Sequence, residues 1–265
     1  MRSAMGMAGR QLISRVRHVG RPRLPRRAIR LAEYEPPDRV VGPYFLPAGY
    51  RARDAPEYYV DVPPPGITYP PDVYRAATRL AQRSGSSRLI DIGCGNAEKL
   101  AALHPRFDVI GIDIGENLAR CRARYPWGIW IEHDLESSGS LPLEPELLSR
   151  SVLICADVLE HLRHPERALT AMREKLGQVE GVVISTPDRE RLSGTDVGGP
   201  PGNPSHVREW TRDEFAALVK SLGFENGLVT YTRPHTGTLT RSTVLAILVP
   251  ERNEHLLHRL TWLHR

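Results

Sequence analysis

Acidic residues and histidines occur in this chain at spacings that could bring them together in a reaction centre. Asp157, Glu160 and His161 form the pattern D-x-x-E-H, and a further histidine, His206, follows much later. If the first stretch turns helically, Asp157 and Glu160 lie one turn apart with His161 beside them. The pKa of an imidazole suits it to accept a hydroxyl proton near neutral pH. His206 is therefore a candidate general base, and a structural histidine that ties its loop to the next helix is the alternative.

The second group surrounds a glycine turn. Residues 89–100 read L-I-D-I-G-C-G-N-A-E-K-L, an apolar strand followed by Gly93 and Gly95 and then by a helix that we expect near Asn96. Glycine allows backbone angles that other residues avoid, and it lets a ligand approach the main chain. The helix would point free N–H groups at whatever lies over the turn. A second apolar strand ends in Asp113, a position that places a carboxylate beside a ribose.

An acidic residue just before the turn indicates the kind of ligand. Asp91 precedes the first glycine, where its charge would repel a pyrophosphate and suit a cationic amino-acid group. A nicotinamide-dependent oxidoreductase is therefore disfavoured.

Four motifs in order resemble those of the class I S-adenosylmethionine (SAM) methyltransferases. They are the glycine turn, G-I-D-I at 111–114, H-D-L at 133–135 and C-A-D-V-L-E-H-L at 155–162. The resemblance covers Tyr69 to Val249. It implies an α/β fold, a doubly wound Rossmann-like sheet of seven strands with an antiparallel last strand, and SAM as the cofactor.

The resemblance also implies a role for each cofactor residue. Asp91 would face the cofactor's amino group, Asp113 would accept both ribose hydroxyls, and Asp134 would accept the adenine amine unless it only caps a turn. Ile114 and Leu135 would form apolar walls. The cofactor-binding residues that we expect are Asp91, Gly93, Cys94, Gly95, Asp113, Ile114, Asp134, Leu135 and Cys155.

The residues expected beside the methyl acceptor, Asp157, Glu160, His161 and His206, resemble motifs of two subgroups of that family. Ubiquinone-pathway O-methyltransferases have E-x-x-E-H, and small-RNA terminal 2′-O-methyltransferases have in addition a histidine before an E-W-T-x-x-E-F-like stretch. In the second subgroup those four residues hold a divalent ion that orients a ribose diol. This chain has Asp157 for the first glutamate and a longer loop rich in Gly and Pro at 198–204. His206, His161 and Glu160 are the candidate catalytic residues, and a divalent metal at them stays open.

Apolar patterning and start and stop signals predict the elements that position these residues. A capping box, Thr211 with Glu214, should open a helix that Gly223 ends. The predicted helices are 73–83, 116–124, 165–176 and the one after Thr211, and the predicted strands are 89–92, 109–112, 129–132, 152–155, 182–185 and an antiparallel hairpin of 228–232 with 243–249.

Charge is concentrated at one end of the chain. Residues 1–30 contain nine arginines and no acid, so the 36 basic residues fall to 27 beyond residue 30 against 31 acidic ones, and the net charge of +5 becomes −4. The high isoelectric point is therefore no argument for a nucleic-acid substrate. Among the arginines, four apolar residues have helical spacing: Leu12, Ile13, Val16 and Val19. Such a segment could bind an anionic membrane or a partner protein, or it could be disordered. An arginine-rich start without acidic residues also mimics a transit peptide.

These patterns predict four segments. We expect a basic, flexible arm at 1–34, a Pro/Tyr-rich arm at 35–71 that covers the active site with tyrosines such as Tyr58, Tyr59, Tyr69 and Tyr74, a SAM-dependent methyltransferase domain at 72–250 and a C-terminal helix at 251–265. Three cysteines without metal-type spacing are typical of core thiols in a reducing cytoplasm. No apolar run is long enough to span a membrane, so we expect a cytoplasmic protein whose basic arm is its only candidate for membrane contact.

The expected function is SAM-dependent O-methylation of a hydroxylated small molecule, such as a sugar or glycan intermediate. A lipid-quinone or RNA-terminus O-methyltransferase is the alternative among enzymes. A non-catalytic SAM-binding partner protein is the alternative of another class.

Overall fold

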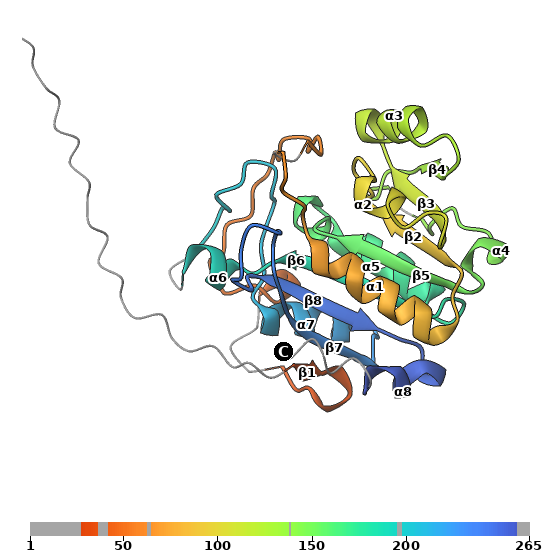
Figure 1. The fold of residues 1–265 in the computed structure, drawn as a ribbon. Helices are drawn as coiled ribbons and strands as arrows, with labels where there is room; N and C mark the ends of the chain where they lie inside the picture. Colours follow the sequence, from red (N-terminus) through yellow and green to blue (C-terminus); the bar gives the residue numbers. More distant parts are fainter. Residues whose placement is uncertain (1–27, 37–41, 63–64, 138, 195–197, 259–265) are drawn as a thin grey trace, which may run out of the picture.

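The architecture is that of a doubly wound α/β protein, as predicted. A computed structural model describes residues 28–36, 42–62, 65–137, 139–194 and 198–258. Its sheet has eight strands in the order β1-β7-β8-β6-β5-β2-β3-β4, as the ribbon in Figure 1 shows. The strands are β1 Ile29–Arg30, β2 Arg88–Ile92, β3 Asp108–Asp113, β4 Ile129–Glu132, β5 Ser151–Ala156, β6 Gly181–Pro187, β7 Gly227–Thr232 and β8 Thr243–Leu248.

Strand directions match the predicted sheet except for one addition. Strands β2 to β6 run parallel, and β8 pairs antiparallel with both β6 and β7. The extra strand β1 pairs antiparallel with β7, and the next residue, Leu31, is fully buried. The basic arm expected at 1–34 therefore ends earlier, since its last residues join the sheet. The amphipathic stretch at 12–19 lies outside the described residues.

Side chains that alternate along the strands separate the core into two layers. In β5, Val152 and Ile154 face one layer while Leu153 and Cys155 face the other, as a period of two requires. In Figure 1, α1 lies in front of the sheet and α5 behind it. The helices are α1 Pro71–Ser84, α2 Glu98–Ala101, α3 Gly115–Arg124, α4 Pro145–Leu148, α5 Pro165–Lys175, α6 Arg189–Ser193, α7 Arg212–Ser221 and α8 Glu254–Leu257, with short 3₁₀ turns η1 Leu31–Glu33, η2 Pro43–Phe45, η3 Leu159–His161 and η4 Glu251–Asn253.

Local signals located the longer helices well and the shorter ones poorly. The capping box of α7 is present, because Thr211 Oγ1 accepts from Glu214 N and Glu214 Oε2 accepts from Thr211 N. The short helices α4 and α6 were not predicted. The predicted C-terminal helix is represented by η4 and α8, and residues 259–265 lie outside the described part. Among the described residues, no helix is both long enough and apolar enough to cross a membrane.

Candidate active site

A cavity of about 830 Å³ opens at the carboxyl ends of the central strands. The turn after β2, Asp113 at the end of β3 and Asp134 after β4 line it. Its acceptor side is formed by η3 and by the loop that carries His206. Residues of the segment from Pro56 to Val62 also line it. The structure therefore brings the predicted catalytic residues to one space with all of the predicted cofactor residues except Asp91 and Cys155.

The turn between β2 and α2 is folded differently from the expectation. Gly93 and Gly95 have φ values of 75° and 56°, and a Cβ on Gly95 would lie 2.5 Å from Asp61 Oδ2. The helix that follows is a single short turn, and Ala97 before it is also in the left-handed region, with φ 53°. No free N–H faces the cavity from this turn, because every backbone N–H from 93 to 98 has an acceptor: Ile112 O for residues 93 and 94, Asp113 Oδ2 for 95, Asp61 Oδ2 for 96, Cys94 O for 97 and Asn96 Oδ1 for 98.

Asp113 is oriented by the main chain on both sides. Its Oδ1 accepts from Ile114 N and its Oδ2 from Gly95 N, each at 2.8 Å. Burial raises the pKa of Asp113, while these N–H donors oppose the rise. The carboxylate is therefore fixed against the turn and lines the cavity where the predicted ribose contact would be. Asp134 also lines the cavity. Its Oδ1 accepts from Glu136 N at 2.9 Å, so Asp134 caps a turn, which was the alternative to an adenine contact.

Asp91 lies beneath the cavity, fully buried. Its Oδ2 accepts a hydrogen bond of 2.6 Å from the Tyr74 hydroxyl, and its Oδ1 has no partner among the described residues. Burial raises the pKa of Asp91 to about 7, although Tyr74 and the charge of Lys99 act in the opposite direction. An unpartnered buried carboxylate oxygen is costly, and an ammonium group of a ligand would satisfy it.

Cys155 does not reach the cavity. Its side chain is fully buried in the apolar layer around α5, and the next residue, Ala156, lines the cavity instead. The alternation of side chains along β5 explains this difference, since one residue in two points away from the α1 side.

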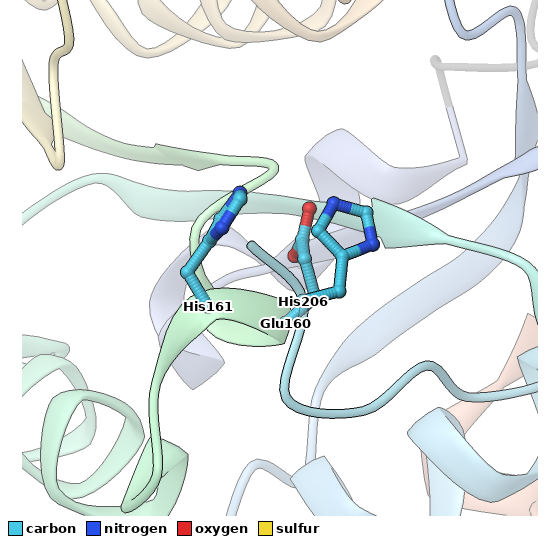
Figure 2. A group of neighbouring side chains, drawn as sticks. All are labelled: Glu160, His161 and His206. Carbon is cyan, nitrogen blue, oxygen red and sulfur yellow. The ribbon is translucent and has the colours of Figure 1, made fainter. Parts of the chain in front are cut away.

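On the acceptor side, Glu160, His161 and His206 lie together. One ligand atom from each lies within 4.8 Å of the others, and Figure 2 shows the three side chains side by side. Glu160 and His161 come from η3, and the loop of His206 is held to η3 because Val207 N donates to Glu160 O at 2.7 Å. This is the convergence that the spacing of the two motifs left open.

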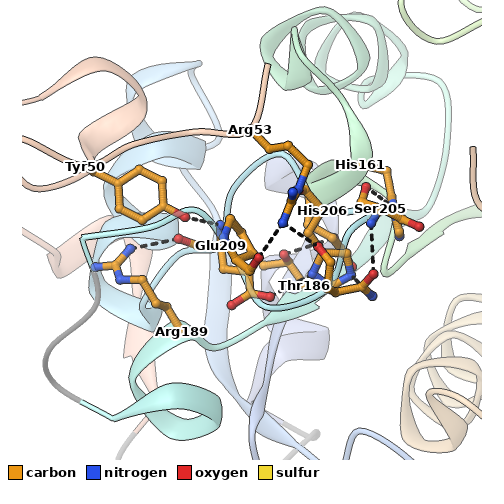
Figure 3. Close-up of polar contacts among 11 residues, drawn as sticks. Tyr50, Arg53, His161, Thr186, Arg189, Ser205, His206 and Glu209 are labelled. Carbon is orange, nitrogen blue, oxygen red and sulfur yellow. Dashed lines mark hydrogen bonds and ion pairs between the residues drawn. The ribbon is translucent and has the colours of Figure 1, made fainter. Parts of the chain in front are cut away.

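Both imidazoles are oriented through the same ring nitrogen. His161 Nδ1 lies 2.9 Å from the Ser205 carbonyl oxygen, and His206 Nδ1 lies 2.7 Å from Glu209 Oε1, as the dashed lines in Figure 3 show. In each ring Nδ1 is therefore placed to donate, and Nε2 is the nitrogen left to accept. Nε2 of His206 lies 2.9 Å from Nδ2 of Asn203, so a cation bound at this nitrogen would take the place of the Asn203 hydrogen bond. A carbonyl or carboxylate behind Nδ1 is the usual support of a metal-ligating histidine.

Burial shifts the pKa values of two members of this group in opposite directions. Glu160 is fully buried, its Oε2 accepts from Thr186 Oγ1 at 3.0 Å, and its Oε1 has no partner among the described residues. Burial raises the pKa of Glu160 well above its usual range, with the charge of Asp157 adding to the rise. Burial lowers the pKa of His161 to about 4, so its imidazole is neutral at pH 7.

Asp157 is separate from this group, contrary to the D-x-x-E-H expectation. It leaves β5 with φ 54°, in the left-handed region, so the chain does not continue helically into η3. Its Oδ1 accepts from Ser185 Oγ at 2.6 Å. The side chain still lines the cavity, between the turn and η3.

The segment from Pro56 to Val62 is held to α3 by Asn117, a residue that the sequence analysis missed. Asn117 of α3 accepts from Asp61 N and donates to the Tyr59 carbonyl, each at 3.1 Å. Tyr58 donates to Ile114 O at 3.0 Å, and the Tyr59 ring lies 5.1 Å from that of His161. Glu209 was also missed, although a carboxylate three residues after His206 was a signal that could have found it.

Comparisons with known proteins show the family of this chain. Residues 68–228 match a protein-family model described as a methyltransferase domain. An uncharacterized protein of Synechococcus sp. (syc1184_c) is 32% identical over 134 residues, which are 46% of this chain and 31% of that protein, so the match spans about a third of its length. Among solved structures, the methyltransferase domain of bacterial CtHen1 has a TM-score of 0.49 at 18% identity, covering 68% of this chain and 98% of that one. The N-terminal domain of EvdMO1, determined with SAH and D-fucose, has a TM-score of 0.47 at 21% identity, covering 69% and 82%.

Proposed function

Since the chain belongs to this methyltransferase family and is a class I SAM-dependent methyltransferase, we propose that it methylates a hydroxyl of a small polyhydroxylated molecule such as a sugar or glycan intermediate. A divalent cation bound by Glu160, His161 and His206 is part of the proposal. The reaction joins the acceptor oxygen to the methyl carbon while the carbon–sulfur bond breaks, and the hydroxyl proton leaves.

The residues on the cofactor side fit SAM. SAM supplies a methyl group activated by its positive sulfur. The unpartnered Oδ1 of Asp91 suits the α-ammonium of the methionine part, and the carboxylate of Asp113 suits a ribose diol. Asp134 and Leu135 line the cavity where the adenine would lie. Tyr58 and Tyr59 line the same cavity, where they would help to keep water from the reacting atoms.

The residues on the acceptor side fit a divalent cation. One carboxylate oxygen and two imidazole nitrogens are a common set of protein ligands for such an ion. A cation at this place would supply a Lewis acid that binds neighbouring hydroxyls and lowers their pKa. Ser205 and Glu209 would keep both rings in the ligating tautomer.

One observation carries the proposal most directly. Among the described residues, Glu160 Oε1 is buried without a partner, and the imidazoles of His161 and His206 lie beside it. A buried oxygen without a hydrogen-bond partner costs about 1–3 kcal/mol, and it costs more if the group is charged. A partner is therefore expected there. A hydroxylated acceptor then meets both the cation and the methyl group within one cavity.

Calorimetry with Mn²⁺ and Mg²⁺ followed by methyl transfer assays tests this. We expect the wild type to bind one ion, Glu160→Gln and His161→Ala to lose it, and the control His164→Ala, which lines the same cavity outside the group, to keep it. Methyl transfer from labelled SAM to sugars with a vicinal diol should stop with a chelator and return with the ion.

The same assay distinguishes the alternatives. Activity that survives chelation but is lost in His206→Ala would contradict the cation and leave His206 as the base. Transfer only to a quinol or to a 3′-terminal ribonucleotide would contradict the sugar. SAM binding without transfer to any acceptor would favour a non-catalytic partner protein.

A further inference from the structure

One charged group of the cofactor has no partner in the residues discussed so far. The methionine part of SAM carries an α-ammonium and an α-carboxylate, and Asp91 serves only the first. Backbone N–H groups at a glycine turn often take an anion. Here they cannot, because every N–H from residue 93 to 98 already donates to an acceptor within the protein.

The walls of the cavity are otherwise unfavourable to a carboxylate. Three carboxylates line the cavity around the turn, those of Asp61, Asp113 and Asp157. Each of them would repel the α-carboxylate of the cofactor. An α-carboxylate placed there needs a positive side chain close by. Of the lysines and arginines that line the cavity, Arg163 and Arg167 lie at the other end, beside Glu136: the main chain of residue 163 donates to the Glu136 carboxylate, and the Arg167 side chain donates to the Glu136 carbonyl.

Lys99 is the cation on the side of the turn. It lies in the first turn of α2, directly after the glycine turn, and it lines the cavity together with Gly93, Gly95 and Tyr74. Its Nζ lies 5.4 Å from the centre of the Tyr74 ring, and that ring's hydroxyl donates to Asp91. Among the described residues, no carboxylate lies at ion-pair distance from Lys99.

From this placement we propose that Lys99 binds the α-carboxylate of the cofactor, so that Asp91 and Lys99 together recognise the two charges of its methionine part. The inference rests on the family and on the turn, and not on which acceptor is methylated.

Two further observations agree with this assignment. Burial is the main cause that raises the pKa of Asp91 and that of Asp157, and in both cases the charge of Lys99 opposes the rise, so its ammonium acts on this side of the cavity. Lys99 and Tyr74 also line a neighbouring cavity of about 410 Å³ with Arg75 and Arg79. The lysine therefore has space on both sides in which to adjust to a ligand.

Isothermal titration calorimetry with three ligands tests the proposal without turnover. SAH carries both charges. Decarboxylated SAM lacks the carboxylate but has a methyl group and a positive charge on sulfur that SAH does not have, and 5′-methylthioadenosine lacks the whole amino-acid part. For Lys99→Met we expect SAH to bind about 10- to 100-fold more weakly, since a charge-assisted hydrogen bond is lost. Binding of decarboxylated SAM and methylthioadenosine should stay within about twofold of the wild type.

The matched control is Arg79→Met, which removes a cation that lines only the neighbouring cavity. Its affinity for SAH should equal that of the wild type. An equal loss for all three ligands in Lys99→Met would overturn the proposal by showing that Lys99 supports the turn itself. Unchanged SAH binding would also overturn it, and a loss of the same size in Arg79→Met would show a general effect of positive charge.

Discussion

Binding of SAH should depend on pH through Asp91. Burial raises the pKa of this carboxyl to about 7, and Oδ1 has no partner until a ligand arrives. The α-ammonium binds the ionised carboxylate and not the protonated acid. Affinity should therefore rise with pH through neutrality, and Asp91→Asn, which has no charge to lose, should remove the dependence.

The size of the effect follows from that pKa. With a pKa of about 7, roughly a tenth of the Asp91 carboxyl groups are ionised at pH 6 and roughly nine tenths at pH 8. The dissociation constant of SAH should therefore be about tenfold lower at pH 8 than at pH 6, equivalent to about 1.4 kcal/mol.

The same pKa predicts the stability of the protein without ligand. Between the unfolded value of 3.8 and the folded value of about 7, the native state holds the Asp91 proton more firmly than the unfolded chain does. Stability therefore falls as pH rises through this window, by at most about 4 kcal/mol for the full shift. Asp91→Asn avoids that loss, so at pH 8 it should melt at a higher temperature than the wild type, and the difference should shrink toward pH 4.

Calorimetric titrations of SAH at pH 6, 7 and 8, for both proteins, measure the first effect. Methylthioadenosine is the control ligand, and its affinity should not change with pH. An Asp91→Asn protein with the same slope as the wild type, or a wild type with none, would refute the role given to Asp91.

Two further predictions concern the local geometry. Gly95→Ala should lower both the melting temperature and the SAH affinity more than Gly85→Ala does, because both residues have positive φ but only the Cβ at 95 would meet Asp61 Oδ2; equal effects of the two substitutions would exclude crowding by Asp61. Thr211→Ala removes the hydroxyl that caps α7 and should lower the free energy of unfolding in urea by about 1 kcal/mol, whereas an unchanged value would show that Glu214 alone secures this helix end.

Features fixed by neighbouring residues were predictable from the sequence. The strands around the turn and the capping box of α7 arise from side-chain periodicity and from contacts three residues apart, and both were found. The placement of His161 and His206 at one edge of the sheet also follows from the sequence pattern, whereas the sequence left open whether Glu160 joins them. This placement needed only that the loops after β5 and β6 lie side by side, which the order of a doubly wound sheet requires.

Features fixed by distant side chains were not predictable. Asp61 takes an N–H of the turn from a segment of the chain that precedes α1, so the turn cannot bind an anion as its sequence suggests. Ser185 of β6 holds Asp157 away from η3, and Ile29 joins the sheet only because β7 offers it an open edge. Each of these contacts depends on three-dimensional packing that periodicity does not record.

The order of the sheet also has a consequence for biosynthesis. The last strand, β8, lies between β6 and β7, so β7 and β1 have no connection to the parallel strands until β8 is inserted. A ribosome delivers residues in order, and residues 243–248 of β8 follow all the other strands of the sheet. Until then β6 and β7 each expose an unpaired edge of apolar residues, which is the kind of surface that associates with other chains. Pairing of β8 is therefore the step that removes these edges from contact with other chains.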